Sequence, residues 1–189
     1  VSNQLGDNRR LMLETQIQQD LRAAADVIAK DLRRSGHWDD AKTSVWHAGV
    51  TTVASNANTG LTHPDPDSAQ PLVPNAPASG VQFRYTREGV VEQSGFRLRN
   101  GAIQMLIGGN WQALTDATTL RITKFEVELN SRDIPLACFS ACGAAPSCPP
   151  TQTVRDITVV IEGAAVHDAS VRRAAQSNAR LRNDVILGA

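Results

Sequence analysis

Apolar residues recur every three or four positions along the first part of the chain, from about Leu11 to Ser35. They are Leu13, Ile17, Leu21, Ala24, Ile28 and Leu32. This spacing predicts an amphipathic α-helix with one apolar face. No glycine or proline interrupts residues 7–35, and Gly36 follows a pair of arginines, as is common where a helix ends. We therefore expect one long helix over about 7–35, on the order of 40 Å in length.

The pattern changes after the predicted helix. Between Thr51 and Ser79 the chain is rich in alanine, asparagine, threonine and proline and shows little periodicity. This composition predicts a long surface loop over about 51–79. We expect at most one short strand just before it, near Val45–Val53.

The dipeptide Asn100-Gly101 predicts a β-hairpin, because both residue types tolerate the positive φ of a two-residue type I′ turn. The turn fixes the register of the two strands. The expected facing pairs are Arg99 with Ala102, Leu98 with Ile103, Arg97 with Gln104, and Phe96 with Met105. The large apolar side chains then share one face and the polar ones the other, as a half-buried antiparallel sheet requires.

More strands are expected on either side of this hairpin. A second turn at 108–110 leads into a strand at 111–114, so that three strands form a meander. Alternating apolar positions predict further strands at Leu120–Leu129, Val154–Glu162 and Ala179–Leu187, with a bulge near Lys124. The fold class is therefore α+β, with a long N-terminal helix packed on antiparallel sheet within a single domain of residues 1–189 and a β-region over about 81–187.

Composition narrows the range of functions. The chain has 189 residues, 41% of them apolar, which is enough for one full core. Basic and acidic residues both number 19 and only 4% of residues are aromatic, so no nucleic-acid partner is expected. No run of about 20 apolar residues is present that could span a bilayer.

Four segments resemble the PilW family of minor type IV pilins. The helix from Gln19 onward ends in Arg33-Arg34-Ser35-Gly36-His37-Trp38, similar to the corner that ends the helix in that family. The meander over 96–114, the strand at 154–159 and the ending at 179–184 also resemble family segments, and all four occur in the family's order. The pseudopilin J of type II secretion is a near cousin, but the Arg-Asn-Asp ending at 182–184 favours the pilus version.

The resemblance implies a role in assembly and no catalysis. PilW-type pilins associate with other minor and major pilins, prime the pilus and its tip complex, and can display a tip adhesin. The same resemblance implies prepilin methylation, twitching motility and cell adhesion. It also implies that pilin contacts follow the helix, for which the candidate residues are Leu5, Leu11, Met12, Ile17 and Leu21.

The chain departs from that family at its beginning. Family members start with an apolar helix half that carries a glutamate near the mature N-terminus, and this chain has neither feature. We therefore expect a transmembrane helix before Val1 in the native protein. The expected location is the bacterial inner membrane and periplasm, and the assembled pilus at the cell surface.

The three cysteines, Cys138, Cys142 and Cys148, lie within one short stretch. They are too few, without a nearby histidine, for a tetrahedral zinc site. In an oxidising compartment one disulfide is expected, which leaves one free thiol. Pairing of Cys138 with Cys148 and pairing of Cys142 with Cys148 both remain open.

Other polar groups give no convincing site, so no catalytic residue, metal or cofactor is expected. Histidine lies near carboxylates at 37–40 and 63–67, but without the spacing of a metal-binding helix or a calcium loop. The run His167-Asp168 with Ser170 lacks the turn that presents a nucleophilic serine. The charged residues of the helix, among them Asp20, Asp26 and Asp31, are interpreted as a solvated face. A stand-alone adhesive or ligand-binding module and a hydrolase with an unrecognised site are the alternatives to a pilus subunit.

Overall fold

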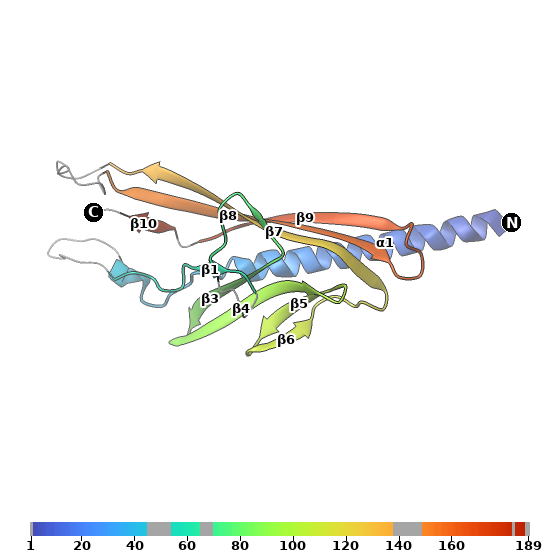
Figure 1. The fold of residues 1–189 in the computed structure, drawn as a ribbon, viewed down its shortest axis with the longest axis horizontal. Helices are drawn as coiled ribbons and strands as arrows, with labels where there is room; N and C mark the ends of the chain where they lie inside the picture. Colours follow the sequence, from blue (N-terminus) through green and yellow to red (C-terminus); the bar gives the residue numbers. More distant parts are fainter. Residues whose placement is uncertain (1, 45–53, 65–69, 138–148, 183, 188–189) are drawn as a thin grey trace.

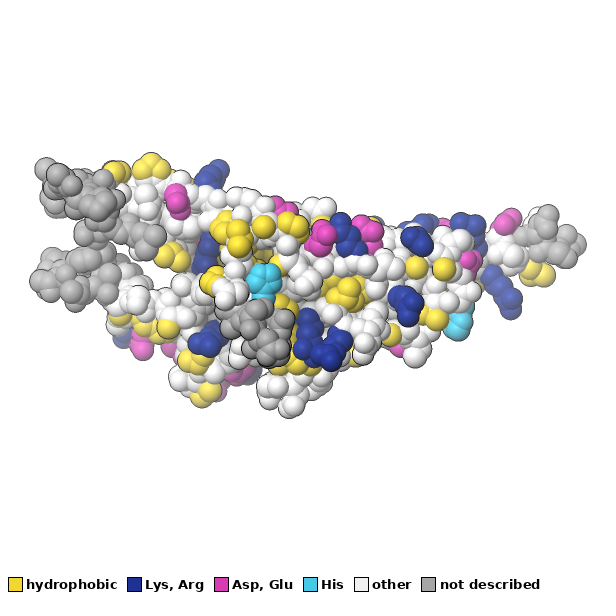
Figure 2. Space-filling model, viewed as in Figure 1, with side chains coloured by type: hydrophobic (Ala, Val, Ile, Leu, Met, Phe, Trp, Pro, Cys, Tyr) yellow, Lys and Arg dark blue, Asp and Glu magenta, His cyan; other side chains and the backbone are white. Residues whose placement is uncertain are grey.

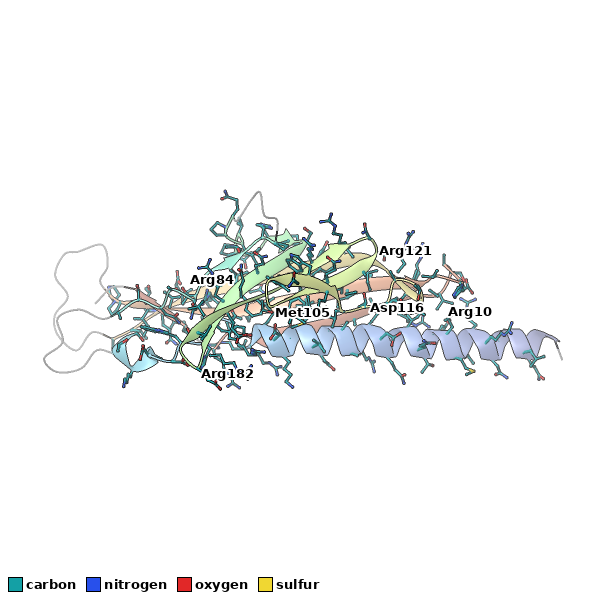
Figure 3. All side chains as sticks on the ribbon, turned by 90° about the horizontal axis from the view of Figure 1, so that it is seen from below. Arg10, Arg84, Met105, Asp116, Arg121 and Arg182 are labelled. Carbon is teal, nitrogen blue, oxygen red and sulfur yellow. The ribbon has the colours of Figure 1, made fainter. Side chains whose placement is uncertain are left out.

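The computed structural model describes residues 2–44, 54–64, 70–137, 149–182 and 184–187. One long helix, α1 (Ser2–Leu32), follows the long axis of an elongated molecule, and two antiparallel sheets cover one side of it (Figures 1 and 3). A short 3₁₀ helix, η1 (Ala41–Ser44), lies beyond its end. This arrangement confirms the predicted α+β class.

Among the described residues, each of the two sheets has five strands. The first has the order β1-β3-β4-β5-β6, with β1 (Leu61–Thr62), β3 (Gly80–Arg87), β4 (Val90–Arg99), β5 (Ala102–Ile107) and β6 (Asn110–Ala113). The second has the order β10-β8-β7-β2, with β9 also paired to β8. Its strands are β2 (Pro77–Ala78), β7 (Leu120–Pro135), β8 (Thr151–Ala165), β9 (Arg172–Arg180) and β10 (Val185–Leu187).

The predicted apolar face of the helix is confirmed, but the helix begins and ends at other residues than predicted. The helix begins at Ser2, before residue 7, and ends at Leu32, before residue 35. The chain tightens at the end, where Arg34 and Ser35 donate to carbonyls three residues back at 2.9 and 3.0 Å. Gly36 then adopts a φ of 75°, and its N–H donates to the carbonyl of Arg84 in β3 at 2.9 Å. The helix therefore stops where its backbone binds the sheet.

The hairpin at Asn100-Gly101 forms with the predicted register. The φ angles of these residues are 52° and 75°, as a type I′ turn requires, and all four predicted pairs face each other. Phe96 and Ile103 are fully buried. Their partners Met105 and Leu98 are half-buried and pack against the same core.

The long strands extend beyond their predicted ends. Strands β7 and β8 pair from Leu120 opposite Ala165 to Pro135 opposite Thr151. Polar pairs carry this extension, for example Asp133 opposite Thr153, whose hydroxyl donates to the carboxylate at 2.6 Å. The predicted bulge is confirmed as a register shift between Ile122 and Lys124.

The expected last strand at 179–187 is wrong. Strand β9 ends at Arg180, and the separate strand β10 pairs with the other end of β8. The sequence of β9 lacks β-branched and aromatic residues, so its pattern gives no strand signal. Its small buried residues Ala175 and Ala179 instead lie on the strand that packs against α1, where larger side chains would hold the helix away.

The loop predicted over 51–79 contains two short strands, β1 and β2. Leu61 in β1 pairs with Phe83, and Ala78 in β2 pairs with Val127. Both Leu61 and Ala78 are buried. Each anchors this region to one of the two sheets. The strand expected near 45–53 lies outside the described residues.

A single cluster of buried side chains joins the helix and both sheets. It includes Leu21 and Ile28 from α1, Phe83 from β3, Val127 from β7 and Ile161 from β8. Gly163 in β8 packs against this cluster, because an added Cβ would come within 2.7 Å of Leu120 and 3.4 Å of Leu21. Close packing on one face therefore leaves the other face of α1 toward solvent (Figure 3).

Candidate assembly interface

The first turns of α1 carry apolar side chains that nothing in the described structure covers. The helix projects past the ends of the sheets, and its narrow end carries both hydrophobic and charged side chains (Figures 1 and 2). Leu5, Leu11 and Met12 are 65%, 60% and 74% exposed. Leu11 precedes the buried Ala29 by about five full turns and so lies on the same side of the helix, but only Ala29 is covered. We call the helical turns that carry Leu5, Leu11 and Met12 the exposed apolar turns.

The structure divides the five residues predicted for pilin contacts. Ile17 and Leu21 are 2% and 0% exposed, because they pack in the core of their own domain. They therefore have no surface to offer a neighbour. Their spacing with Ala24 and Ile28 already marked them as part of the continuous core face.

Polar contacts fix α1 to β9 at the point where the helix leaves the sheets. The carboxylate of Glu14 accepts hydrogen bonds from Arg10, at 3.1 Å, and from Arg173 of β9. Ser177 of β9 donates to the carbonyl of Ala25 at 3.2 Å. Sequence reasoning missed the contacts of Arg173 and Ser177, because their partners on α1 lie far away along the chain. The turns before Glu14 are therefore the part of the helix that projects.

Asp31 corrects the interpretation of the charged helix residues as a solvated face. Asp31 is 5% exposed, and its carboxylate accepts hydrogen bonds from the Ser94 hydroxyl, at 2.6 Å, and from Arg34, at 2.9 Å. Asp31 follows Ile28 by three positions, which places it beside the core face. That spacing was the available signal for its burial.

The residues considered for chemistry around His37 and His167 occupy helix-end and turn positions, whereas 65–67 lie outside the described residues. His37 Nδ1 lies 2.7 Å from the carbonyl of Thr86, and Asp39 accepts from the backbone N–H of Gly89 at 2.8 Å. Asp168 accepts from the N–H and hydroxyl of Ser170 at 3.0 and 2.6 Å, and these bonds lower the pKa of its carboxyl. The arrangement is a side-chain turn, in which the Ser170 hydroxyl is already bound.

Within the part of the chain that the structure describes, no three histidine, cysteine or acidic side chains come together as a metal site would require. The cysteines predicted to form a disulfide, Cys138, Cys142 and Cys148, lie outside the described residues. Across those same ranges, no helix combines the length and apolar character needed to cross a membrane.

The chain matches the model of one protein family over residues 10–181, which include most of α1 and nearly all of both sheets. The description of that family is prepilin peptidase-dependent protein B. It agrees with the type IV pilin-like resemblance, although it is not PilW. No curated protein and no solved structure matches the chain. By this match, the chain belongs to the prepilin peptidase-dependent protein B family, a type IV pilin-like family.

Proposed function

We propose that this protein is a minor pilin of the PilW kind that helps to prime a type IV pilus and its tip complex through contacts with other pilins. The observation that carries the proposal is the set of exposed apolar turns, Leu5, Leu11 and Met12, on the projecting end of α1. Its partners are other minor and major pilins and a tip adhesin. It works in the inner membrane and periplasm and in the assembled pilus, without catalysis.

Burial of the exposed apolar turns gives such contacts a driving force. Full burial of a leucine or methionine side chain stabilises an association by about 1.5–3 kcal/mol. Three such side chains alone offset only part of the entropy lost on association. Subunits held together in one membrane would meet at a high effective concentration, so that weak helix contacts suffice. We therefore expect the isolated domain to be monomeric or weakly associating.

The proposal is tested in a strain that lacks the gene and is complemented with the full-length protein. The test variant carries Leu11→Ser and Met12→Ser. The matched control carries Val90→Ser and Val91→Ser, which also alter two exposed apolar residues but lie on β4. The measurements are surface pili by electron microscopy, sheared pilin by immunoblot, and twitching.

We expect the deletion strain to lose surface pili and twitching. Wild-type protein and the Val90/Val91 control should restore both, and the Leu11/Met12 variant should restore neither fully. Normal pili in the deletion strain would refute the priming role. Equal rescue by both double variants would show that the exposed apolar turns are not the contact surface.

A type II secretion pseudopilin could use the same helix surface, since the family is pilin-like rather than specific to pili. The same deletion strain separates the two roles. Loss of type II secretion with normal pili would assign the protein to secretion. Normal pili and normal secretion, together with loss of surface attachment, would favour a stand-alone adhesive module.

A further inference from the structure

A groove of about 550 Å³ lies at the end of α1, and five of its ten lining residues are lysine or arginine. Lys30, Arg33 and Arg34 come from α1 and the turn after it, Arg87 comes from the end of β3, and Arg182 comes from the segment between β9 and β10. Figure 3 shows Arg182 beside the end of the helix. Three distant parts of the chain therefore bring positive charge to one hollow, which we call the basic groove.

Most of this charge has no partner within the described structure. Arg34 is paired with Asp31 at 2.9 Å, and its guanidinium lies over the ring of Tyr85, 4.2 Å from the centroid. Among the described residues, the side chains of Lys30, Arg33, Arg87 and Arg182 form no ion pair. All four belong to exposed residues. Like charges gathered around one hollow repel one another, so an anion in the groove would relieve that repulsion.

The helix dipole explains only part of the groove. Basic residues at a helix C-terminus interact favourably with the partial negative charge of the last carbonyls, which accounts for Lys30 and Arg33. Arg87 and Arg182 lie on other elements, so the dipole does not account for their position. Their convergence with the helix cations is the feature that indicates an anionic ligand.

We propose that the basic groove binds a peptide segment rich in aspartate and glutamate on a neighbouring subunit. That the occupant belongs to a pilin subunit rests on the proposed function, whereas the acidic chemistry rests on the groove itself. Arginine side chains bind carboxylates through paired, charge-assisted hydrogen bonds. A hollow of this volume has room for a few carboxylate side chains.

A peptide fits the groove better than a nucleic acid does. Asp39 and Glu88 also line the hollow and would repel a continuous phosphate backbone. The ring of Tyr85 is buried and covered by Arg34, so it offers no face on which a base could stack. A peptide can place its carboxylates beside the arginines and its neutral residues beside Asp39 and Glu88.

The direct test measures the fluorescence anisotropy of a short labelled Glu-Gly repeat peptide with the purified chain at low salt. We expect saturable binding that weakens as salt is added, and no binding of the matched Gln-Gly peptide. Arg33→Gln, Arg87→Gln and Arg182→Gln should each weaken binding about fivefold, because each removes one close charge contact. Arg22→Gln, on the exposed side of α1 and outside the groove, should leave binding unchanged.

Three results of this assay would overturn the proposal. The first is that the Gln-Gly peptide binds as tightly as the Glu-Gly peptide. The second is that Arg22→Gln weakens binding as much as the groove variants do. The third is that a single-stranded oligonucleotide binds more tightly than the Glu-Gly peptide. The last result would assign the groove to nucleic acid. Thermal melts of the variants should match the parent, because the substituted side chains are exposed.

The identity of the occupant is tested in cells. Arg87→Glu should reduce surface pili in the complemented strain, and Arg22→Glu should not. If the purified chain binds the Glu-Gly peptide but the deletion strain has normal pili and normal secretion, the proposed binding in the groove stands and the proposed function is refuted. If the deletion strain loses its pili and the Arg87→Glu variant restores them fully, the proposed function stands. The proposal that a pilin segment occupies the groove is then refuted.

Discussion

Asp31 is the polar contact that connects the end of α1 to β4. Its buried carboxylate accepts from Ser94 and Arg34, so Asp31→Ala leaves the buried Ser94 hydroxyl without its acceptor. An unsatisfied buried group costs about 1–3 kcal/mol, and we expect the free energy of unfolding to fall by that amount. Chemical denaturation measures the loss.

The matched control is Asp26→Ala, an exposed aspartate on the same helix, which should change stability by less than about 0.5 kcal/mol. A double-mutant cycle of Asp31→Ala with Ser94→Ala isolates the coupling between the two side chains. Similar losses in Asp31→Ala and Asp26→Ala would show that this contact does not stabilise the fold.

Tyr85 gives a second prediction at the residue scale. Burial raises the pKa of its phenol above the usual 10.0, and a hydrogen bond to Glu92 at 2.9 Å raises it further, against a smaller opposing effect of Arg34. Tyr85 is the chain's single tyrosine, so the ultraviolet absorbance of tyrosinate reports on it alone. We expect a titration midpoint above 10.0 in the folded protein, and a lower one in Glu92→Gln.

The sign of the linked stability follows from the raised pKa. The folded protein holds the Tyr85 proton more tightly than the unfolded chain does. The stabilisation is therefore fully present below the unfolded pKa of about 10 and is lost as pH rises through the folded pKa. Tyr85→Phe should flatten this alkaline decrease, and a folded midpoint at or below 10.0 would contradict the burial argument.

At the scale of elements, the turn at Asn100-Gly101 depends on a glycine. Gly101 has a φ of 75°, and an added Cβ would lie 3.3 Å from Cγ of Arg121. Gly101→Ala should therefore destabilise the domain by about 1 kcal/mol or more, measured by thermal unfolding. Gly60→Ala is the control, since Gly60 lacks a positive φ and a Cβ there would meet open space. Equal melting temperatures for the two variants would contradict the turn geometry.

Sequence patterns predicted the elements whose signals are local. The core face of α1 and the register around Asn100-Gly101 follow from spacing and turn chemistry within a few residues. Strand β9 was predicted incorrectly, because it is defined by pairing with β8 and by packing against α1. The hydrogen bond between Asp31 and Ser94 was also missed, since the two residues are distant in sequence. The same limit applies to the basic groove, which joins Arg33, Arg87 and Arg182 only after folding.

At the scale of the whole molecule, the helix has two parts with different surroundings. From Leu13 onward its apolar face packs on the sheets, and Glu14 is bound to Arg173. The residues before Leu13, 4–12, are all exposed, and the helix projects past the ends of the sheets at this end (Figure 1). Stability therefore depends on the later turns of this helix, and under the proposed function assembly depends on the earlier ones. The sequence predicted this helix, but the point at which it leaves the sheets required the structure.

This division predicts the effect of truncation. Deletion of the residues before Leu13 should leave the melting temperature close to that of the parent, because the exposed apolar turns bury nothing in the domain. Helical circular dichroism should fall, since the removed residues are helical. Deletion through Leu21 should destabilise the domain strongly, because Ile17 and Leu21 fill the core and the loss of each costs about 2–5 kcal/mol. A large fall in melting temperature on the shorter deletion would show that the projecting turns stabilise the domain, and the separation between folding and assembly surfaces would then be wrong.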